Sequence, residues 1–447
     1  MSMCRSAERV LTTSALAWVL VSTGARAAQR EVRLGDSFEA AVESLAPGDT
    51  LIVHAGTYAD SGRISISVRG TAALPVVIRS ADGEPRPLIT RTASAAVQNT
   101  INIEGATYLT VRGLEISSNG GDGINLNSVP SYVTLDDLVI HDVDVGVNVR
   151  SSMGHLQVLH SHIHHTGADG GTGEGMYVGC NYATCIVQDS VFAGNWIHDT
   201  RQSTQGDGIE IKLGSHSNVV RDNVIHDTGY PCILLYGTQG GARNVVEGNV
   251  LWNCGDSGIQ AAADAVIRNN LILESPGSGF NSQDHQGATP QNLEFAHNTV
   301  VGGSPCLRLN NWSGKTGLVL ANNAVYCESG SYAISGVSGV AVAGNVIVPA
   351  TSSLPSSGYR VGRSASQDFL DAASRSVYPS ATSPLIGAGS STWVTAVDFN
   401  GTSRTGAPDA GAYAWTGPTN PGWVVTAGFK DASAGAPPAP PTSLRAQ

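Results

Sequence analysis

One lysine in a strand-like stretch is the first side chain whose type and position could do chemistry. Only three of the 25 basic residues are lysines. Lys212 lies in GIEIKLG (208–214), where Ile209 and Ile211 share one face and Glu210 and Lys212 share the other. Burial or neighbouring cations can lower the pKa of a lysine until its amine accepts a proton, whereas arginine stays protonated. Lys212 is therefore a candidate base, and the alternative is a solvated lysine in a surface ion pair with Glu210.

The element that must position this lysine is a repeat. An asparagine followed by two apolar residues recurs at intervals of 21 to 28 residues, with no helical periodicity between the copies. Repeats of this length, built from short alternating strands, predict a β-solenoid whose coils stack about 4.8 Å apart. The repeated residues are Asn195, Asn223, Asn249, Asn270, Asn298, Asn323 and Asn345.

A second unit in the coils, mostly a Gly or Cys followed by alternating residues, places two columns of side chains on the outward face of one sheet. The first column is Asn125, Asn148, Tyr177, Glu210, Leu234, Gln260, Asn281 and Arg308. The second column is Asn127, Arg150, Gly179, Lys212, Tyr236, Ala262, Gln283 and Asn310. One coil spacing and two residues along a strand place the Cα atoms of Tyr177 and Lys212 about 8 Å apart. Long side chains at these positions can therefore reach one bound molecule.

The two ends of the chain differ from the repeat. Arg5 and Arg9 precede an apolar run that ends at the small-x-small site Ala25–Ala27, which is typical of a secretory signal. We therefore expect the mature chain outside the cell or in the periplasm. A short helix that begins at Ser37 is expected to cap the coils. The predicted units are a signal peptide (1–27), a parallel β-helix domain (28–350), a C-terminal coil and cap segment (351–415) and a disordered tail (416–447).

Six cysteines follow the predicted signal, and an even number in a secreted chain indicates disulfides. None of them has the CxxC spacing of a zinc site. Four of them form two pairs with similar offsets from the repeated asparagines of neighbouring coils, and the other two are close in sequence. Six cysteines can pair in many ways, and we predict the bridges Cys180–Cys185, Cys232–Cys254 and Cys306–Cys327.

The charge of the chain argues against two classes of partner. The formal net charge is −11, and charged residues make up 14% of the chain. This composition provides no basic surface for nucleic acid. The only long apolar run is the predicted signal, and it is too short to span a bilayer. We therefore expect no nucleic-acid partner, no membrane segment and a monomeric chain.

Several motifs resemble a known group of proteins. PGDTLIVHAGTY (47–58), the Asn-apolar coils and the GAYAW ending (411–415) resemble secreted right-handed parallel β-helix proteins of the pectin-lyase-like superfamily. GEGMYVG (173–179), followed one coil later by GDGIEIK (206–212), is similar to the polysaccharide lyases that cleave alginate-type uronates, particularly those of the family 31 type. Those enzymes use a tyrosine and a lysine on adjacent coils. The resemblance implies that Tyr177 and Lys212 are the catalytic pair of a lyase acting on an acidic, uronate-containing polysaccharide.

The implied reaction is a β-elimination. It needs a base for the C5 proton, an acid for the departing 4-O oxygen, and a cation or hydrogen-bond donors on the uronate carboxylate. Lys212 would be the base and Tyr177 the acid. Arg150 could bind the carboxylate bidentately, and Tyr236 could stack on a sugar ring. The other candidate substrate-binding residues are Glu210, Asn148, Gln260, His285 and Arg201.

Three alternative functions stay open. A glycoside hydrolase of the polygalacturonase type would need paired carboxylates, and Asp207 and Glu210 are the nearest, although the motifs of that family are absent. A C5-epimerase would share the first half of the elimination chemistry. A non-catalytic carbohydrate-binding β-helix would use the same face without a reaction.

Two clusters raise the question of a metal. Four histidines recur at one place in successive coils and are followed by a tryptophan: His141, His164, His198, His226 and Trp252. Because aligned repeats place like residues over each other, we predict a stacked polar column at a turn in preference to a metal ladder. Four acidic residues could gather Ca²⁺, although no ligand run of recognisable spacing appears: Asp169, Glu174, Asp207 and Glu210. We therefore predict no metal and no cofactor.

Overall fold

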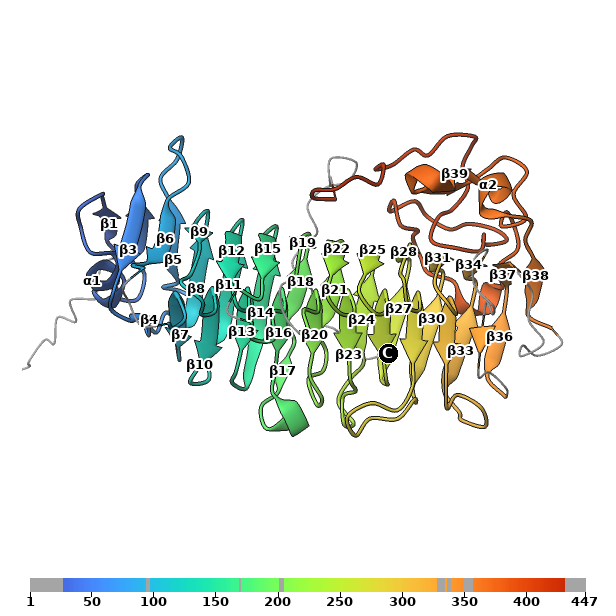
Figure 1. Ribbon diagram of the computed structural model, residues 1–447, viewed down its shortest axis with the longest axis horizontal. Coiled ribbons are helices and arrows are strands. Elements are labelled where there is room, and N and C mark those ends of the chain that lie inside the picture. The colour runs from blue at the N-terminus through green and yellow to red at the C-terminus, as the bar shows by residue number, and fades with distance from the viewer. Residues whose placement is uncertain are drawn as a thin grey trace, which may run out of the picture.

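The chain winds into stacked coils that form three long parallel sheets along one axis (Figure 1). The predicted all-β parallel β-helix is thus confirmed. The computed structural model describes residues 27–93, 97–168, 170–200, 205–327, 334–335, 339–348 and 357–430. All but the last residue of the predicted signal, together with Asp169 and Arg201, lie outside the described residues.

Within the described residues, the three sheets contain 14, 11 and 13 strands and are called sheets A, B and C here. Sheet A consists of β1 (Gln29–Val32), β2 (Thr50–Val53), β5 (Val76–Ser80), β8 (Thr107–Arg112), β11 (Ser131–Asp136), β14 (Met153–Leu159), β17 (Val187–Gln188), β18 (Val191–Ala193), β21 (Val219–Arg221), β24 (Asn244–Glu247), β27 (Ala265–Arg268), β30 (Leu293–Ala296), β33 (Leu318–Ala321) and β36 (Ala341–Ala343). Sheet B consists of β4 (Ile64–Ile66), β7 (Ile101–Glu104), β10 (Ile124–Asn127), β13 (Val147–Val149), β16 (Met176–Val178), β20 (Ile209–Ile211), β23 (Ile233–Leu235), β26 (Ile259–Ala261), β29 (Phe280–Ser282), β32 (Leu307–Leu309) and β35 (Ile334–Ser335). Sheet C consists of β3 (Thr57–Asp60), β6 (Leu88–Arg91), β9 (Glu115–Ile116), β12 (Val139–Val143), β15 (His162–Thr166), β19 (Trp196–His198), β22 (Val224–Thr228), β25 (Val250–Cys254), β28 (Leu271–Leu273), β31 (Thr299–Val301), β34 (Ala324–Tyr326), β37 (Asn345–Val348) and β38 (Tyr359–Val361).

Sheet B shows how the sequence sets the register of the coils. Ile209 and Ile211 of β20 point inward and are buried in the continuous apolar core. A Cβ atom added at Gly208 would lie 2.4 Å from the carbonyl oxygen of Cys232 in the next coil. Glycine is required there because the neighbouring coil approaches too closely for a side chain. This close approach fixes where β20 begins, and so fixes which residues of the strand point outward.

The repeated asparagines form a buried hydrogen-bonded ladder at the edge of sheet C, in agreement with the sequence period. Asn249 is typical: its main-chain N–H and its Nδ2 donate to Oδ1 of Asn270 in the next coil at 3.0 and 2.9 Å. Its own Oδ1 accepts from the N–H and Nδ2 of Asn223. Its Nδ2 also donates to the Val220 carbonyl at 3.0 Å, so the Asn249 amide satisfies two buried main-chain groups of the preceding coil and is itself bonded to the amide of the next.

Replacing Asn249 by alanine should lower the free energy of unfolding by about 3 kcal/mol or more, because several buried polar groups lose their partners at about 1–3 kcal/mol each. A urea titration followed by circular dichroism measures the change. Asn310→Ala removes an exposed amide of the same type and should change stability by less than about 0.5 kcal/mol. Equal midpoints for the two variants would show that the ladder carries no special stability.

The three predicted disulfides are all present. Cys180 is bonded to Cys185 within one loop, and the other two bridges, Cys232–Cys254 and Cys306–Cys327, join neighbouring coils. The predicted column of stacked rings is also confirmed, but its placement at a turn is wrong, because the rings lie on successive strands of sheet C. Neighbouring centroids are 5.2, 5.3, 5.0 and 4.2 Å apart along the series His141, His164, His198, His226 and Trp252.

Helix α1 (Phe38–Glu43) lies at the N-terminal end of the coils (Figure 1). It begins after Ser37, as predicted, and Ser37 Oγ accepts a hydrogen bond from the Ala40 N–H at 3.0 Å. Phe38 is buried in the core against Tyr58, with ring centroids 6.2 Å apart. No helix within the described residues is long and apolar enough to cross a bilayer.

The C-terminal segment folds back over the outward face of sheet C (Figure 1). Tyr413 of the GAYAW motif packs in one apolar cluster with Tyr326 of β34 and Trp252 of β25. The regular elements of this segment are α2 (Ala365–Asp368), β39 (Phe369–Asp371), η2 (Ala372–Ser374), β40 (Ser376–Pro379) and η3 (Ser391–Trp393).

The segment with the composition of a disordered tail, 416–447, is described as far as Lys430. Lys430 Nζ donates to Asp222 Oδ1 at 2.7 Å and to the Gly248 carbonyl at 3.1 Å, which ties the described part of the tail to the coils. The predicted boundaries between the signal, the β-helix domain and the C-terminal segments stay predictions.

Candidate active site

The outward face of sheet B carries the first predicted column in the predicted order. Tyr177 of β16 pairs with Glu210 of β20, and Glu210 pairs with Leu234 of β23. The same register continues in both directions, to Asn148 and Asn125 and to Gln260, Asn281 and Arg308. The alignment of the repeat is therefore confirmed residue by residue.

Lys212 follows β20 directly and lies between two tyrosine rings. Its Nζ is 4.3 Å from the ring centroid of Tyr177 and 5.1 Å from that of Tyr236. Only 4% of Lys212 is exposed. The interpretation of Lys212 as a solvated surface lysine is therefore wrong: the two aromatic side chains cover it although it points away from the core.

Glu210 connects the lysine to the second tyrosine. Its Oε1 accepts a hydrogen bond from Lys212 Nζ and another, at 2.7 Å, from Tyr236 Oη. Burial, followed by the negative charge of Glu210, raises the pKa of the Tyr236 phenol. Tyr236 therefore stays protonated and acts as a fixed donor to Glu210.

The Tyr177 phenol does not share the Glu210 carboxylate but bonds to a loop residue. Its Oη donates to Asn181 Oδ1 at 3.2 Å, and Asn181 lies in η1 (Asn181–Ala183), inside the loop closed by the Cys180–Cys185 bridge. Burial raises the pKa of the Tyr177 phenol, while the nearby Lys212 charge acts in the opposite direction. Tyr177 is therefore protonated at neutral pH and can give up a proton only to a strongly basic atom.

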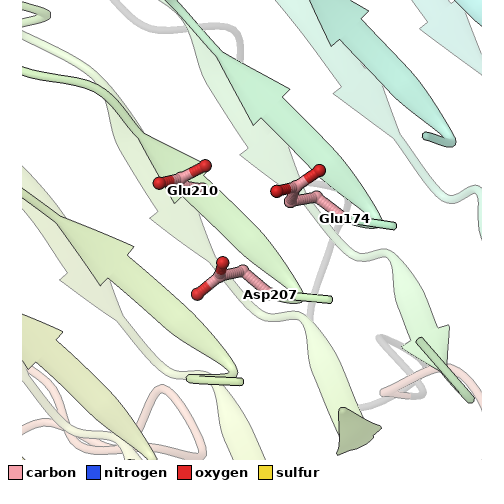
Figure 2. A group of neighbouring side chains, drawn as sticks. All are labelled: Glu174, Asp207 and Glu210. Atoms are coloured by element: carbon pink, nitrogen blue, oxygen red, sulfur yellow. The ribbon is translucent and has the colours of Figure 1, made fainter. Parts of the chain in front are cut away.

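Three buried carboxylates lie close enough to Lys212 to interact with its charge. Glu174, Asp207 and Glu210 come from two neighbouring coils, and each offers an oxygen within 4.8 Å of the others (Figure 2). Each is at most 1% exposed. Burial is the main cause that raises the pKa of Glu174 to about 7, and burial followed by the charge of Glu210 raises the pKa of Asp207 well above its ordinary value. The cluster thus holds protons near neutral pH.

The raised pKa of Glu174 predicts a pH dependence of stability. The folded state binds a proton there up to about pH 7, whereas the unfolded chain releases it near pH 4.5. Between these values the native state holds more protons, so the contribution of Glu174 is present at low pH and is lost as pH rises through 7. The melting temperature of Glu174→Gln minus that of the wild type should therefore be more positive at pH 8 than at pH 5. Thermal melts of both proteins over this range measure the difference, and a constant gap would contradict it.

The other predicted substrate-binding residues are placed along the same face. Arg150 is exposed, and its Cζ is 5.3 Å from the Tyr177 ring centroid. The amide side chains of the first column bond to neighbouring protein groups. Asn148 Nδ2 donates to Asp122 Oδ2 at 2.8 Å, and Gln260 Oε1 accepts from Asn281 Nδ2 at 3.3 Å. His285 stacks on Tyr236 with centroids 5.0 Å apart.

Two residues of this neighbourhood were missed in the sequence. Asp122 holds Asn148 and Asn125, and Asn181 accepts from Tyr177. Asp122, Glu174 and Asp207 each stand directly before the glycine that opens a strand of sheet B, so an alignment extended by one residue would have shown them as a third column. No repeat could have revealed Asn181, because it lies in a loop that other coils lack.

Two family models match parts of the chain. Residues 89–241 match the model described as "Right handed beta helix region", and residues 172–358 match the model described as "Periplasmic copper-binding protein (NosD)". No curated protein matches the chain. Together with the sheets, the first match identifies the fold as a right-handed parallel β-helix.

Solved structures with the same fold include polysaccharide lyases. Pectate lyase Pel9A is 15% identical, with 88% of this chain and 97% of that chain covered and a TM-score of 0.54. The complex of XylC with xylose is 10% identical, covers 87% and 98%, and has a TM-score of 0.61. The PL6 family polysaccharide lyase Pedsa3628 from Pseudopedobacter saltans is 13% identical, covers 82% and 100%, and has a TM-score of 0.50. At these identities the likeness shows the fold alone.

Proposed function

We propose that the protein is a secreted polysaccharide lyase that cleaves a uronate-containing polymer by β-elimination, with Lys212 as the base and Tyr177 as the acid. The observation that carries the proposal is the buried amine of Lys212, 4.3 Å from the Tyr177 ring on the outward face of adjacent coils. The polysaccharide lyases among its structural neighbours support the reaction class. The three disulfides support an oxidising location outside the cytoplasm.

Lys212 must be neutral to act as a base, and Glu210 provides the route. Glu210 Oε1 already accepts a hydrogen bond from Lys212 Nζ, so a proton can pass along this bond. When substrate closes the site, the proton passes from Nζ to Oε1. The free amine then removes the C5 proton, and the electron pair of the C5–H bond forms the C4=C5 double bond.

Tyr177 completes the elimination. As the C4–O4 bond breaks, the leaving oxygen becomes a strong base and takes the phenolic proton, which the high pKa of Tyr177 would deny to a weaker acceptor. The new ammonium of Lys212 then returns a proton to the phenolate beside it. The pair is thereby restored without a net change in its protons.

The charges of the site suit a polyanion better than the composition of the chain indicates. Glu174 and Asp207 carry raised pKa values, so at neutral pH they contribute less negative charge than two ordinary carboxylates would. Arg150 is exposed next to Tyr177 and would bind the uronate carboxylate, whose neutralisation acidifies the C5 proton. The local potential is therefore set by Arg150 and by the Lys212–Glu210 pair.

The carboxylates of this site fit a glycoside hydrolase less well than the site as a whole fits a lyase. A retaining glycosidase places its two carboxyl groups about 5–5.5 Å apart, and an inverting one about 6.5–9.5 Å apart, on either side of an accessible bond. In this protein the oxygens of Glu174, Asp207 and Glu210 lie within 4.8 Å of one another, and none of the three is more than 1% exposed. They cannot flank a sugar without a rearrangement of the face above them.

Incubation with alginate, glucuronan and pectate tests the function. A lyase produces an unsaturated uronate whose C4=C5 double bond absorbs in the ultraviolet, together with new reducing ends. A hydrolase produces reducing ends without the absorbance, an epimerase produces neither, and a binding protein leaves every polymer unchanged while retaining it on a column. Absence of the ultraviolet product with every uronate polymer would overturn the proposal.

The proposed reaction uses no metal ion. Lys212 places its positive charge against Glu210, and the base and the acid of the reaction are both side chains of this protein. We expect that dialysis against EDTA leaves the rate within about twofold of the untreated enzyme. A loss that CaCl₂ restores would instead make the three carboxylates a Ca²⁺ site.

A further inference from the structure

The outward face of sheet B carries few charges for a surface that binds an acidic polymer. Four members of its two columns are charged: Arg150, Glu210, Lys212 and Arg308. Glu210 and Lys212 form an ion pair with each other. Within the described part of the chain, neither Arg150 nor Arg308 forms an ion pair with an acidic side chain. The columns therefore offer two cations to the carboxylates of a ligand.

These two arginines lie far apart along the axis. Six strand-to-strand steps separate β13, which Arg150 follows, from β32, which carries Arg308. At about 4.8 Å per coil, the separation along the axis is about 29 Å. A pyranose in an extended polymer advances by about one coil spacing, so a polymer made of uronate alone would bring a carboxylate to nearly every coil between them.

The stretch of this face between Lys212 and Arg308 is neutral. A carboxylate held against neutral side chains would lose water without gaining a counter-charge, which is unfavourable. Amide groups can instead donate to and accept from the hydroxyl groups of a sugar. The members of the two columns in this stretch are Leu234, Tyr236, Gln260, Ala262, Asn281 and Gln283.

A hollow lies at the far end of the neutral stretch. Its volume is about 520 Å³, and it is lined by Gln283, Asp284, Asn310, Asn311 and Ser313. Gln283 directly follows β29 and Asn310 directly follows β32, just as Lys212 directly follows β20. The hollow therefore continues the edge of sheet B on which Lys212 lies, three to four coils further along the axis.

The polar groups of the hollow suit hydroxyl groups better than a carboxylate. Asn310 Nδ2 donates to Gln283 Oε1 at 3.2 Å, and Asn311 Nδ2 donates to Asp284 Oδ2 at 2.7 Å. Lys315 Nζ is 3.8 Å from Asp284 Oδ1, so its positive charge is matched by that of the carboxylate. A carboxylate only accepts hydrogen bonds, whereas a hydroxyl also donates. A uronate would therefore bring its charge against Asp284, and a neutral sugar would donate to the same oxygens.

We propose that the substrate is a heteropolymer in which several neutral sugars separate one uronate from the next, and that one of these neutral sugars binds in the hollow at Gln283 and Asp284. The inference rests on the proposed lyase function and narrows its substrate class. The polymer runs along the axis of sheet B. Arg150 binds the carboxylate of the uronate at the cleaved bond, the amides bind hydroxyl groups, and Arg308 lies where the next carboxylate can be neutralised.

Partial reduction of the carboxyl groups of alginate, glucuronan and pectate tests the substrate class. Carbodiimide activation followed by borohydride converts a uronate into the neutral hexose and leaves the linkages unchanged. For a polymer that yields the ultraviolet product, reduction of about half of the carboxyl groups should raise kcat/KM per remaining uronate at least about threefold. Product from the reduced form alone would support the inference most strongly.

The outcomes separate this inference from the lyase function. An equal or lower kcat/KM per uronate on the reduced polymer would overturn the heteropolymer and leave the lyase function standing. Absence of the ultraviolet product from every native and reduced polymer would overturn the lyase function, and the inference would fall with it.

A variant tests whether the polymer passes the hollow. Gln283→Lys places a cation in the neutral stretch, so its KM for the native polymer should fall at least about threefold relative to its KM for the reduced polymer, with kcat unchanged. Gln188→Lys is the matched control, because it adds the same charge at an exposed glutamine of β17 on sheet A and should keep the wild-type ratio. Melting temperatures establish that both variants are folded. A wild-type ratio in Gln283→Lys would show that the substrate does not reach the hollow.

Discussion

Replacing Lys212 by arginine should leave the protein folded and lower kcat/KM on its polymer by about a thousandfold or more. Arginine keeps the positive charge against Glu210 and can still lie between Tyr177 and Tyr236, but it stays protonated and cannot take the C5 proton. Substitution by alanine would be a poorer test. It would leave Glu210 buried without the cation that now contacts it, and the resulting instability would obscure the catalytic loss.

The control for Lys212→Arg is Lys315→Arg, at a partly exposed lysine that contacts Thr289 and lies 3.8 Å from Asp284. It makes the same chemical change away from the Tyr177 ring and should leave kcat/KM within about twofold. Initial rates of ultraviolet product formation measure both variants, and melting temperatures establish folding. Activity of Lys212→Arg within tenfold of the wild type would show that the amine acts only through its charge.

The sequence predicts a large part of this site because the repeat carries the register. Once Gly208 is aligned with Gly175, the pairing of Glu210 with Tyr177 follows, and so does the side of the strand on which Lys212 lies. The repeated asparagines predicted the bridge Cys232–Cys254. These two cysteines lie nine and five residues after Asn223 and Asn249, and the offsets of Cys306 and Cys327 from their own asparagines are similar. Short-range periodicity therefore determines which residues share a face.

The repeat could not show how deeply the side chains of the site are buried. Outward residues of a solenoid are expected to be solvated, yet Glu210 and Lys212 are buried because Tyr236 and Tyr177, from the coils on either side, cover them. This burial arises from four large side chains packing together, and no single strand specifies it. Glu174, in the neighbouring coil, is itself fully buried, and this burial raises its pKa to about 7.

Contacts made by loop residues are the second feature of the site that the sequence could not predict. Asn181 reaches Tyr177 only because the Cys180–Cys185 bridge closes a short loop beside β16. His285 reaches Tyr236 from a turn whose backbone pairs with Ala288. Contacts of this kind depend on conformations that occur once in the chain, so a periodic pattern carries no information about them.

Replacing Tyr177 by phenylalanine should lower kcat by about a hundredfold to ten-thousandfold and change KM much less. The ring that covers Lys212 stays in place, and only the phenol that protonates the leaving oxygen is lost. The hydrogen bond to Asn181 is lost as well, but Asn181 lies on an exposed loop and can be solvated instead. Tyr182→Phe, at an 83% exposed tyrosine of the same loop, is the control and should have wild-type kinetics.

The two roles can be separated by the leaving group. A synthetic uronide that carries an aryloxy group at C4 provides the test. The aryloxy group leaves as a phenoxide, which is a weak base and does not need to be protonated. Tyr177→Phe should therefore recover most of the wild-type rate on this substrate, whereas Lys212→Arg should stay inactive, since C5 still has to lose its proton. If the phenylalanine variant is equally impaired on both substrates, Tyr177 does not protonate the leaving oxygen, and its contribution must lie in holding Lys212. If the arginine variant recovers instead, the assignment of base and acid is reversed.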